Sequence, residues 1–145
     1  MKKAIIFTAI LFIAIIGAIT ILSARPNTIG GSAVAGDDKV IIYEFYGKGC
    51  PHCTKLNKWI EEIKPKYPQL EVVQHEVYKN STNRKMFQKM AKAYGKNSGG
   101  VPSIFIGEKN IIGFSPQIGE KIIAEILKCT EAFCASPLTK LDELE

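Results

Sequence analysis

The chain has 145 residues, 46% of them hydrophobic, and a formal net charge of +5. Three of the basic residues flank an apolar N-terminal segment, and from Asp37 onward 16 Lys and Arg residues face 14 Asp and Glu residues, a net charge of +2. This length accommodates one compact domain, and the nearly balanced charge of that domain argues against a nucleic-acid-binding protein, which needs a concentrated basic stripe.

The N-terminal segment consists of Met1-Lys2-Lys3 followed by an almost purely apolar run from Ala4 to Leu22. Nineteen residues in a helix span about 28 Å, close to the hydrocarbon thickness of a bilayer, whereas signal-peptide cores are about 7–15 residues long. We therefore expect residues 1–24 to form an uncleaved signal-anchor helix that crosses the membrane. A cleaved signal peptide is the alternative.

Both interpretations of the leader place the rest of the chain outside the cytoplasm. Two lysines precede the apolar run and one arginine, Arg25, follows it, which favours a cytoplasmic N-terminus. Residues 25–38 are rich in Gly, Ser, Ala and Asn and are predicted to be a flexible linker. The domain is therefore expected to be periplasmic or on the cell surface, anchored to the membrane or secreted after cleavage, in a compartment where disulfides persist.

The chain after the linker alternates between strand and helix patterns. Segments rich in β-branched and aromatic residues are predicted as strands, and segments with apolar residues at helical spacing are predicted as helices. In chain order we predict a strand at 39–46, a helix from Cys53 to Pro65, a strand at 70–77, a helix capped by Ser81 or Thr82 and ending near Tyr94, strands at 103–107 and 111–114 around a turn at 108–110, and a helix from Pro116.

This β-α-β-α-β-β-α order predicts an α/β fold, with a four-stranded mixed sheet and helices on both of its faces. The first two strands should pair in parallel through a right-handed crossover, and the last two should be antiparallel. We place the domain at 39–130 and a C-terminal tail at 131–145. Six basic residues between Lys79 and Lys96 have no acidic residue among them; they are expected to be a solvated helix face, or else a surface for a membrane or an acidic partner.

Cys50-Pro51-His52-Cys53 lies where the first predicted strand gives way to a helix. Such a CxxC pair can be a redox pair, half of a zinc site or a haem attachment site. Thr54 stands where haem attachment requires a histidine, and the other two cysteines, Cys129 and Cys134, are five positions apart, which is poor spacing for zinc. The pattern therefore favours a redox pair without a metal, with zinc as the weaker alternative.

The position of the motif indicates the role of each of its residues. A cysteine at a helix N-terminus faces free backbone N–H groups and the positive end of the helix dipole, which stabilise a thiolate. Cys50, at the exposed tip, is the predicted nucleophile, and Cys53, one turn into the helix, can close the ring or resolve a mixed disulfide. Pro51 suits the first helical turn. His52, between the cysteines, is expected to tune the pair, and a passive surface residue is the alternative.

Glu44 lies in a predicted strand whose two faces are both apolar. A central strand covered on both sides would bury this carboxyl and raise its pKa by desolvation. Glu44 would then suit proton transfer to or from Cys53. An exposed strand residue is the alternative.

The arrangement of a strand, CPHC and a helix, followed by Val101-Pro102 before a short strand, resembles the thioredoxin superfamily. The resemblance implies that Pro102 follows a cis peptide bond and faces the cysteines, and that the backbone at Val101 pairs with a substrate chain. CPHC, Glu44 and Val101 are shared with periplasmic dithiol oxidases of the DsbA type. Their large helical insertion is missing, as is the N-terminal β-α unit of thioredoxin, so the size is closer to a glutaredoxin-like minimal domain.

We therefore expect an enzyme that exchanges disulfides with exported, cysteine-containing proteins. Because stabilising the reduced form makes the oxidised form a stronger oxidant, the motif favours a dithiol oxidase, with a membrane redox partner to reoxidise it. No cofactor beyond the Cys50–Cys53 disulfide is expected, and the protein is expected to be a monomer. The alternatives are a membrane-anchored reductase of the same fold, or a metal- or client-binding module without turnover.

Cys129 and Cys134 are expected to form a structural disulfide. Residues five apart in an unbroken helix have Cα atoms about 8–9 Å apart, beyond the reach of a disulfide. The bond therefore requires the last helix to end near Cys129 and the chain to turn back. A second redox pair that relays electrons to Cys50–Cys53, or two free thiols, are the alternatives.

Overall fold

The computed structural model describes residues 39–143, so the helix predicted at 1–24 and the linker at 25–38 lie outside the described residues. Between residues 39 and 143, no helix is long and apolar enough to cross a membrane. The elements are β1 (Val40–Tyr46), α2 (Pro51–Ile63), a 3-10 turn η1 (Lys64–Lys66), β2 (Leu70–Glu76), α3 (Ser81–Ala93), β3 (Ser103–Ile106), β4 (Lys109–Ile112), α4 (Pro116–Glu131) and α5 (Thr139–Asp142).

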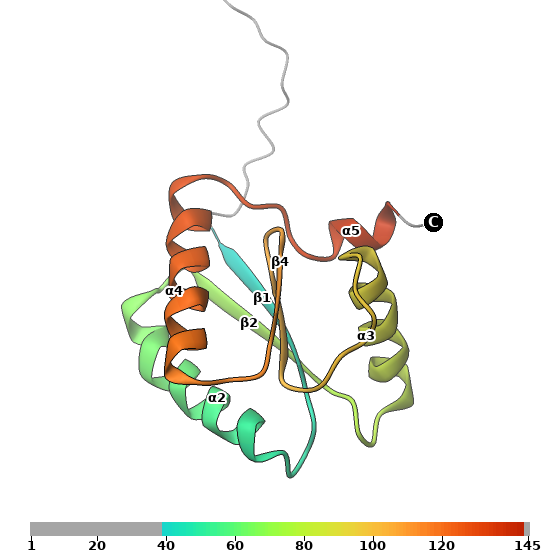
Figure 1. Ribbon diagram of the computed structural model, residues 1–145. Helices are drawn as coiled ribbons and strands as arrows, with labels where there is room; N and C mark the ends of the chain where they lie inside the picture. Colours follow the sequence, from blue (N-terminus) through green and yellow to red (C-terminus); the bar gives the residue numbers. More distant parts are fainter. Residues whose placement is uncertain (1–38, 144–145) are drawn as a thin grey trace, which may run out of the picture. The chain divides into compact units, whose positions relative to one another are not determined.

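The predicted α/β fold is confirmed. The four strands form one mixed sheet in the order β2-β1-β3-β4, in which β1 and β2 are parallel and the other two pairs are antiparallel. Helices α2 and α4 lie on one side of this sheet, and α3 and α5 lie on the other (Figure 1). The central strand β1 is therefore covered on both faces, and the loop after its last residue leads directly into α2.

Two apolar clusters hold these layers together, one on each face of the sheet. Alternate residues of β1 point to opposite faces, so Val40 and Ile42 belong to the cluster under α2 and α4, whereas Tyr43 and Phe45 belong to the cluster under α3. The helices contribute apolar residues at helical spacing, as the sequence predicted: Leu56, Ile60 and Ile63 from α2, Ile122 and Ile126 from α4, and Phe87 and Met90 from α3. Ala91 of α3 is buried in the same cluster.

The turn between the last two strands differs from the prediction. Ile106 pairs with Lys109, so the hairpin loop has only two residues, and β4 begins two positions earlier than expected. Gly107 has φ +48, which fits the hairpin turn that takes glycine at its first central position. The N-cap of α3 also differs, because the Asn80 side chain accepts the Asn83 N–H at 3.0 Å in place of a cap by Ser81 or Thr82.

The C-terminal region is more ordered than the expected tail. Helix α4 continues to Glu131, and α5 follows after a short connection. Leu138 and Leu141 pack against the cluster under α3, and Lys140 forms an ion pair of 2.6 Å with Glu108 in the β3–β4 turn. The domain therefore continues beyond residue 130, because α5 and the residue before it pack on the same face of the sheet as α3.

Candidate active site

The two cysteines of the CPHC motif lie at the N-terminus of α2. Cys50 is the N-cap residue, Pro51 is the first helical residue, and the Cys53 N–H donates to the Cys50 Sγ at 3.4 Å. Both cysteines carry free thiols. The Cys50 sulfur therefore occupies the position of a capping oxygen, where a helix end stabilises negative charge.

Cys50 is less accessible than its place at the tip of the helix suggested. Its exposed fraction is 8%, against 2% for Cys53, whereas Pro51 and His52 are exposed. The covering segment is the loop before β3, because the Cys50 thiol donates to the Val101 carbonyl at 3.7 Å. A partner must therefore reach the sulfur alongside this loop.

The loop before β3 carries the proline that the resemblance pointed to. The Val101–Pro102 peptide bond is cis, as expected. Pro102 is fully buried, and its carbonyl accepts the Gly113 N–H at 2.7 Å, which ties the loop to the end of β4. The structure thus brings Val101, the residue before this proline, beside Cys50, although the two are 51 positions apart in the chain.

Glu44 is fully buried on β1, with no exposed surface. The Gln74 Nε2 donates to its carboxyl at 2.8 Å from the adjacent strand. Asn57 of α2 also donates to both carboxyl oxygens, at 2.9 Å, when its amide is oriented with the nitrogen toward them. Burial raises the pKa of Glu44 to about 7, against the opposing effect of the Gln74 hydrogen bond.

The Cys53 thiol is strongly biased toward its neutral form. Burial raises its pKa to about 12, and the hydrogen bond with Cys50 and the negative charge of Glu44 act in the same direction. A backbone hydrogen bond from Gly47 opposes these effects and lowers the pKa. Cys53 therefore needs a proton acceptor when it attacks and a proton donor when it leaves. The Glu44 carboxyl, whose charge acts on Cys53, has a pKa of about 7 and suits both tasks.

His52 lies on the exposed side of the motif, and within residues 39–143 no hydrogen bond joins it to Cys50. It borders a groove of about 420 Å³, whose floor includes Trp59 and Phe114 with their ring centroids 5.4 Å apart. A second groove, of about 270 Å³, lies on the other flank of the site and is lined by Tyr78, Phe87 and Val101, among others. Apolar surface is therefore available on both sides of Cys50.

Comparison with known proteins identifies the fold. No family model matches the sequence, and the sequence has no significant match among curated proteins. Similar solved structures include a protein described as the thiol:disulfide interchange protein DsbE from Chlorobium tepidum, with a TM-score of 0.50 and 18% identity over 65% of this chain and 82% of that one. The chain has a thioredoxin-like fold.

Two further structures are similar to the thioredoxin-like domain at lower scores. Thioredoxin O2 from Arabidopsis thaliana has a TM-score of 0.48 and 17% identity, over 60% of this chain and 74% of that one. Glutaredoxin 1 from Francisella tularensis has a TM-score of 0.42 and 23% identity, over 61% of this chain and 98% of that one.

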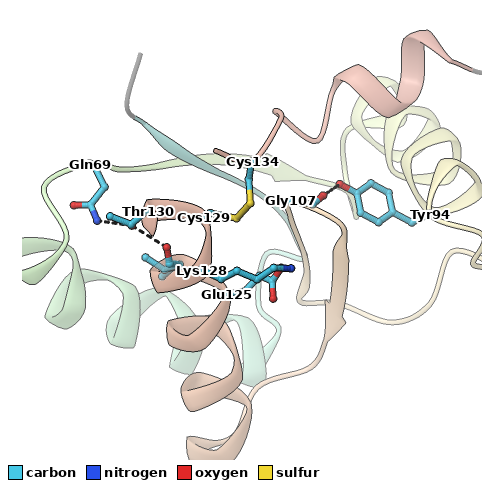
Figure 2. Close-up of a disulfide and its surroundings, with 9 residues drawn as sticks. Gln69, Tyr94, Gly107, Glu125, Lys128, Cys129, Thr130 and Cys134 are labelled. Atoms are coloured by element: carbon cyan, nitrogen blue, oxygen red, sulfur yellow. Dashed lines mark hydrogen bonds and ion pairs between the residues drawn. A yellow bond between two sulfur atoms is a disulfide. The ribbon is translucent and has the colours of Figure 1, made fainter. Parts of the chain in front are cut away.

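The second cysteine pair of the thioredoxin-like domain is a disulfide, as predicted. Cys129 and Cys134 are bonded with their Cα atoms 5.0 Å apart, because α4 ends at Glu131 and Ala132 is extended. Figure 2 shows the bond beside Gly107, where an added Cβ would lie 3.1 Å from both sulfurs. The bond therefore closes the end of α4 against the β3–β4 turn.

This disulfide lies at the opposite end of the sheet from the CPHC motif. Strand β3 runs antiparallel to β1, with Ser103 opposite Phe45 and Ile106 opposite Ile42. Gly107 is therefore near the start of β1, whereas Cys50 follows its end. The two pairs are therefore separated by the length of β1, about 20 Å for seven extended residues, and their sulfurs are not in contact. Among the described residues, no group of three or more His, Cys, Asp or Glu side chains could hold a metal ion.

Sequence reasoning missed the two amides that contact the buried carboxyl. Gln74 is paired with Glu44 in the register of β1 and β2, and Asn57 follows Cys53 by four positions, on the same side of α2. A parallel pairing that aligned the two predicted strands by their first apolar residues would have placed Gln74 beside Glu44. The sequence held no comparable signal for the orientation of Asn57.

Proposed function

We propose that this protein is a thiol–disulfide oxidoreductase that acts as a dithiol oxidase on exported proteins. The observation that supports this best is the placement of Cys50 at the N-terminus of α2, with Cys53 in the same helical turn and the Val101 carbonyl 3.7 Å from the Cys50 sulfur. The sulfur that must react is thus the more exposed of the two and lies beside a backbone segment that a client chain can approach.

In the oxidised protein, a client thiolate attacks the Cys50 sulfur of the Cys50–Cys53 disulfide. A mixed disulfide forms, and Cys53 leaves as a thiolate. With a pKa of about 12 this thiolate takes up a proton, and the Glu44 carboxyl, with a pKa of about 7, is the buried group able to supply it. Glu44 then regains its proton from solvent.

A second client thiolate next attacks the client sulfur of the mixed disulfide. Cys50 leaves as a thiolate stabilised by the N-terminus of α2, and the client gains a disulfide. Two electrons have passed from the client to the protein, which is left as the dithiol. An external oxidant, proposed to be a membrane redox protein, returns the pair to the disulfide.

Client binding is proposed to use the backbone at Val101. An extended client segment beside this residue would place its cysteine against Cys50, and side chains on either side would reach the two flanking grooves. Backbone pairing gives affinity without demanding a particular sequence. Such recognition suits a protein that must accept many unfolded clients.

The oxidising direction is proposed from His52 and from the helix N-terminus. A histidine beside the nucleophile and the positive end of α2 both favour the Cys50 thiolate, and a stabilised dithiol makes the disulfide a stronger oxidant. The proposed extracytoplasmic location rests on the apolar run from Ala4 to Leu22. The Cys129–Cys134 disulfide is consistent with an oxidising compartment.

The test is to equilibrate the full chain, in detergent micelles, with glutathione buffers and to measure the oxidised fraction of Cys50–Cys53. We expect a reduction potential above the value of about −270 mV that is typical of thioredoxin, together with oxidation of reduced ribonuclease. Cys50→Ser serves as the inactive control. A potential at or below that of thioredoxin, with reduction of insulin, would favour a reductase, and bound metal without any exchange would favour a binding module.

A further inference from the structure

The carboxylate of Glu76, at the end of β2, accepts four backbone N–H groups. Its Oε1 accepts from Tyr78 at 2.9 Å and from Lys48 at 3.2 Å. Its Oε2 accepts from Lys79 at 2.8 Å and from Asn80 at 3.2 Å. Three of these donors belong to the loop that follows Glu76, but Lys48 belongs to the loop between β1 and α2. One side chain therefore joins two loops that are 28 positions apart.

The β1–α2 loop is the segment that leads to the thiol pair. The Cys50 N–H donates to the Gly47 carbonyl at 3.0 Å, and a backbone hydrogen bond from Gly47 reaches the Cys53 thiol. The Tyr78 ring covers Gly47 so closely that an added Cβ would overlap it. The position of Gly47 relative to the thiols thus depends on contacts with the β2–α3 loop.

Glu76 is well suited to hold this junction because it is charged. Burial acts to raise the pKa of Glu76, but the four backbone N–H groups outweigh it and hold the pKa below the ordinary value. Hydrogen bonds that involve a charged partner are about twice as strong as neutral ones. The carboxylate therefore binds both loops throughout the neutral pH range.

The β2–α3 loop also has ties that do not reach the thiols. Arg84 donates from Nε to the Val77 carbonyl at 2.9 Å and from Nη2 to the Tyr78 carbonyl at 2.6 Å. These two bonds fix the same loop from the side of α3 and make no contact with the β1–α2 loop. Arg84 is therefore a reference that supports the same loop as Glu76 but takes no part in the hydrogen bond to Lys48.

We propose that Glu76 is a positioning residue of the dithiol, whose carboxylate ties the β1–α2 loop to the β2–α3 loop and holds the Gly47 backbone beside Cys53. Its effect is on the resolving step, in which the Cys53 thiolate attacks the Cys50 sulfur of a mixed disulfide and the bound thiol leaves as a thiolate. The inference rests on the proposed redox function of the pair, but it concerns a step that needs no protein client.

The experiment uses the full chain in detergent micelles, reduced at Cys50 and Cys53 and mixed with oxidised glutathione. The Cys50 thiolate attacks the glutathione disulfide and releases one glutathione; Cys53 then attacks Cys50 and releases the second. Acid quenching and mass spectrometry follow the Cys50–glutathione adduct with time. The resolution rate is compared in wild type, Glu76→Ala, Glu76→Gln and Arg84→Met, with the unfolding midpoint of each.

In Glu76→Ala, resolution should slow by about threefold or more at neutral pH. Displacing the Gly47 hydrogen bond raises the pKa of Cys53. Each pKa unit of increase lowers the thiolate fraction of Cys53 tenfold, and the greater nucleophilicity of the more basic thiolate offsets part of the resulting loss in rate. Glu76→Gln, which keeps one acceptor oxygen, should lie between. Arg84→Met loosens the same loop but leaves the hydrogen bond between Glu76 and the Lys48 N–H in place. At a similar loss of stability it should therefore slow resolution less than Glu76→Ala does.

Equal slowing in Glu76→Ala and Arg84→Met at a similar loss of stability would overturn the inference, because it would show that Glu76 acts only on the loop's stability. An unchanged resolution rate in Glu76→Ala would overturn it as well. Failure of the proposed function gives a different result, in which the wild type forms and resolves the glutathione adduct but does not exchange disulfides with proteins.

Discussion

Replacing Glu44 by Gln should change how the stability of the domain depends on pH. The carboxyl has a pKa of about 7 in the folded protein, against an ordinary value of 4.5. A group whose pKa is raised by folding stabilises the folded state fully at pH values below the ordinary pKa, and this contribution is lost as the pH rises through the folded pKa. A difference of this size corresponds to about 3 kcal/mol.

The free energy of unfolding is best measured by denaturant titration between pH 4.5 and pH 8. A Cys50→Ser background prevents oxidation of the thiol pair, and the full chain is kept in detergent micelles. Between the two ends of this range, the protein with Glu44 should lose about 3 kcal/mol relative to Glu44→Gln. Glu120→Gln, a change at an exposed glutamate of α4, should leave the pH dependence as it is.

The prediction concerns how steeply the free energy of unfolding changes with pH, and not the difference between the two proteins at any one pH. Glu44→Gln changes the hydrogen bonds with Gln74 and Asn57 at every pH, so a constant difference in stability is expected as well. If the curves of the Glu44→Gln variant and of the protein that keeps Glu44 ran parallel from pH 4.5 to pH 8, Glu44 would ionise near its ordinary pKa in the folded state. The role of Glu44 as proton donor to Cys53 would then lose its basis.

The second disulfide, His52 and the leader each give a further prediction. Replacing Cys129 and Cys134 by alanine should cost about 2 kcal/mol of stability, as expected for a short closed loop, and a changed glutathione equilibrium of Cys50–Cys53 would contradict a purely structural role. His52→Gly should make the reduction potential more negative by tens of millivolts; an unchanged value would remove the tuning role. Carbonate extraction of native membranes should leave the full-length chain in the pellet, and a shortened soluble product would contradict the anchor.

The layered fold could be predicted because its signals are local and repeated. The alternation of Val40, Ile42 and Tyr43 along β1, and the helical spacing of Leu56 and Ile60 in α2, each identify an element and the face that it buries. The short helix α5 gave no such signal. Four residues are too few for periodicity, and the helix depends on the packing of its neighbours.

In the candidate site too, the features with a local sequence signal could be predicted and the others could not. The positions of the cysteines followed from the start of the helix, and the burial of Glu44 followed from the two apolar faces of its strand. The partners of Glu44 and the bridge made by Glu76 could not be predicted, because they depend on strand register and on loop conformation. The turn at Gly107 depends on loop conformation as well. The loop has two residues where three were predicted, and β4 therefore begins at Lys109 and not at Ile111.

The most direct test of the central claim is to trap mixed disulfides in the native cell. Cys53→Ala removes the thiol that resolves, so the account predicts that this variant accumulates covalent complexes with exported proteins through Cys50, and that reductant releases them. Cys50→Ala should trap none, because the remaining thiol is buried and has a pKa of about 12. Equal trapping by both variants, or none by either, would contradict the assignment of Cys50 as the exchanging thiol.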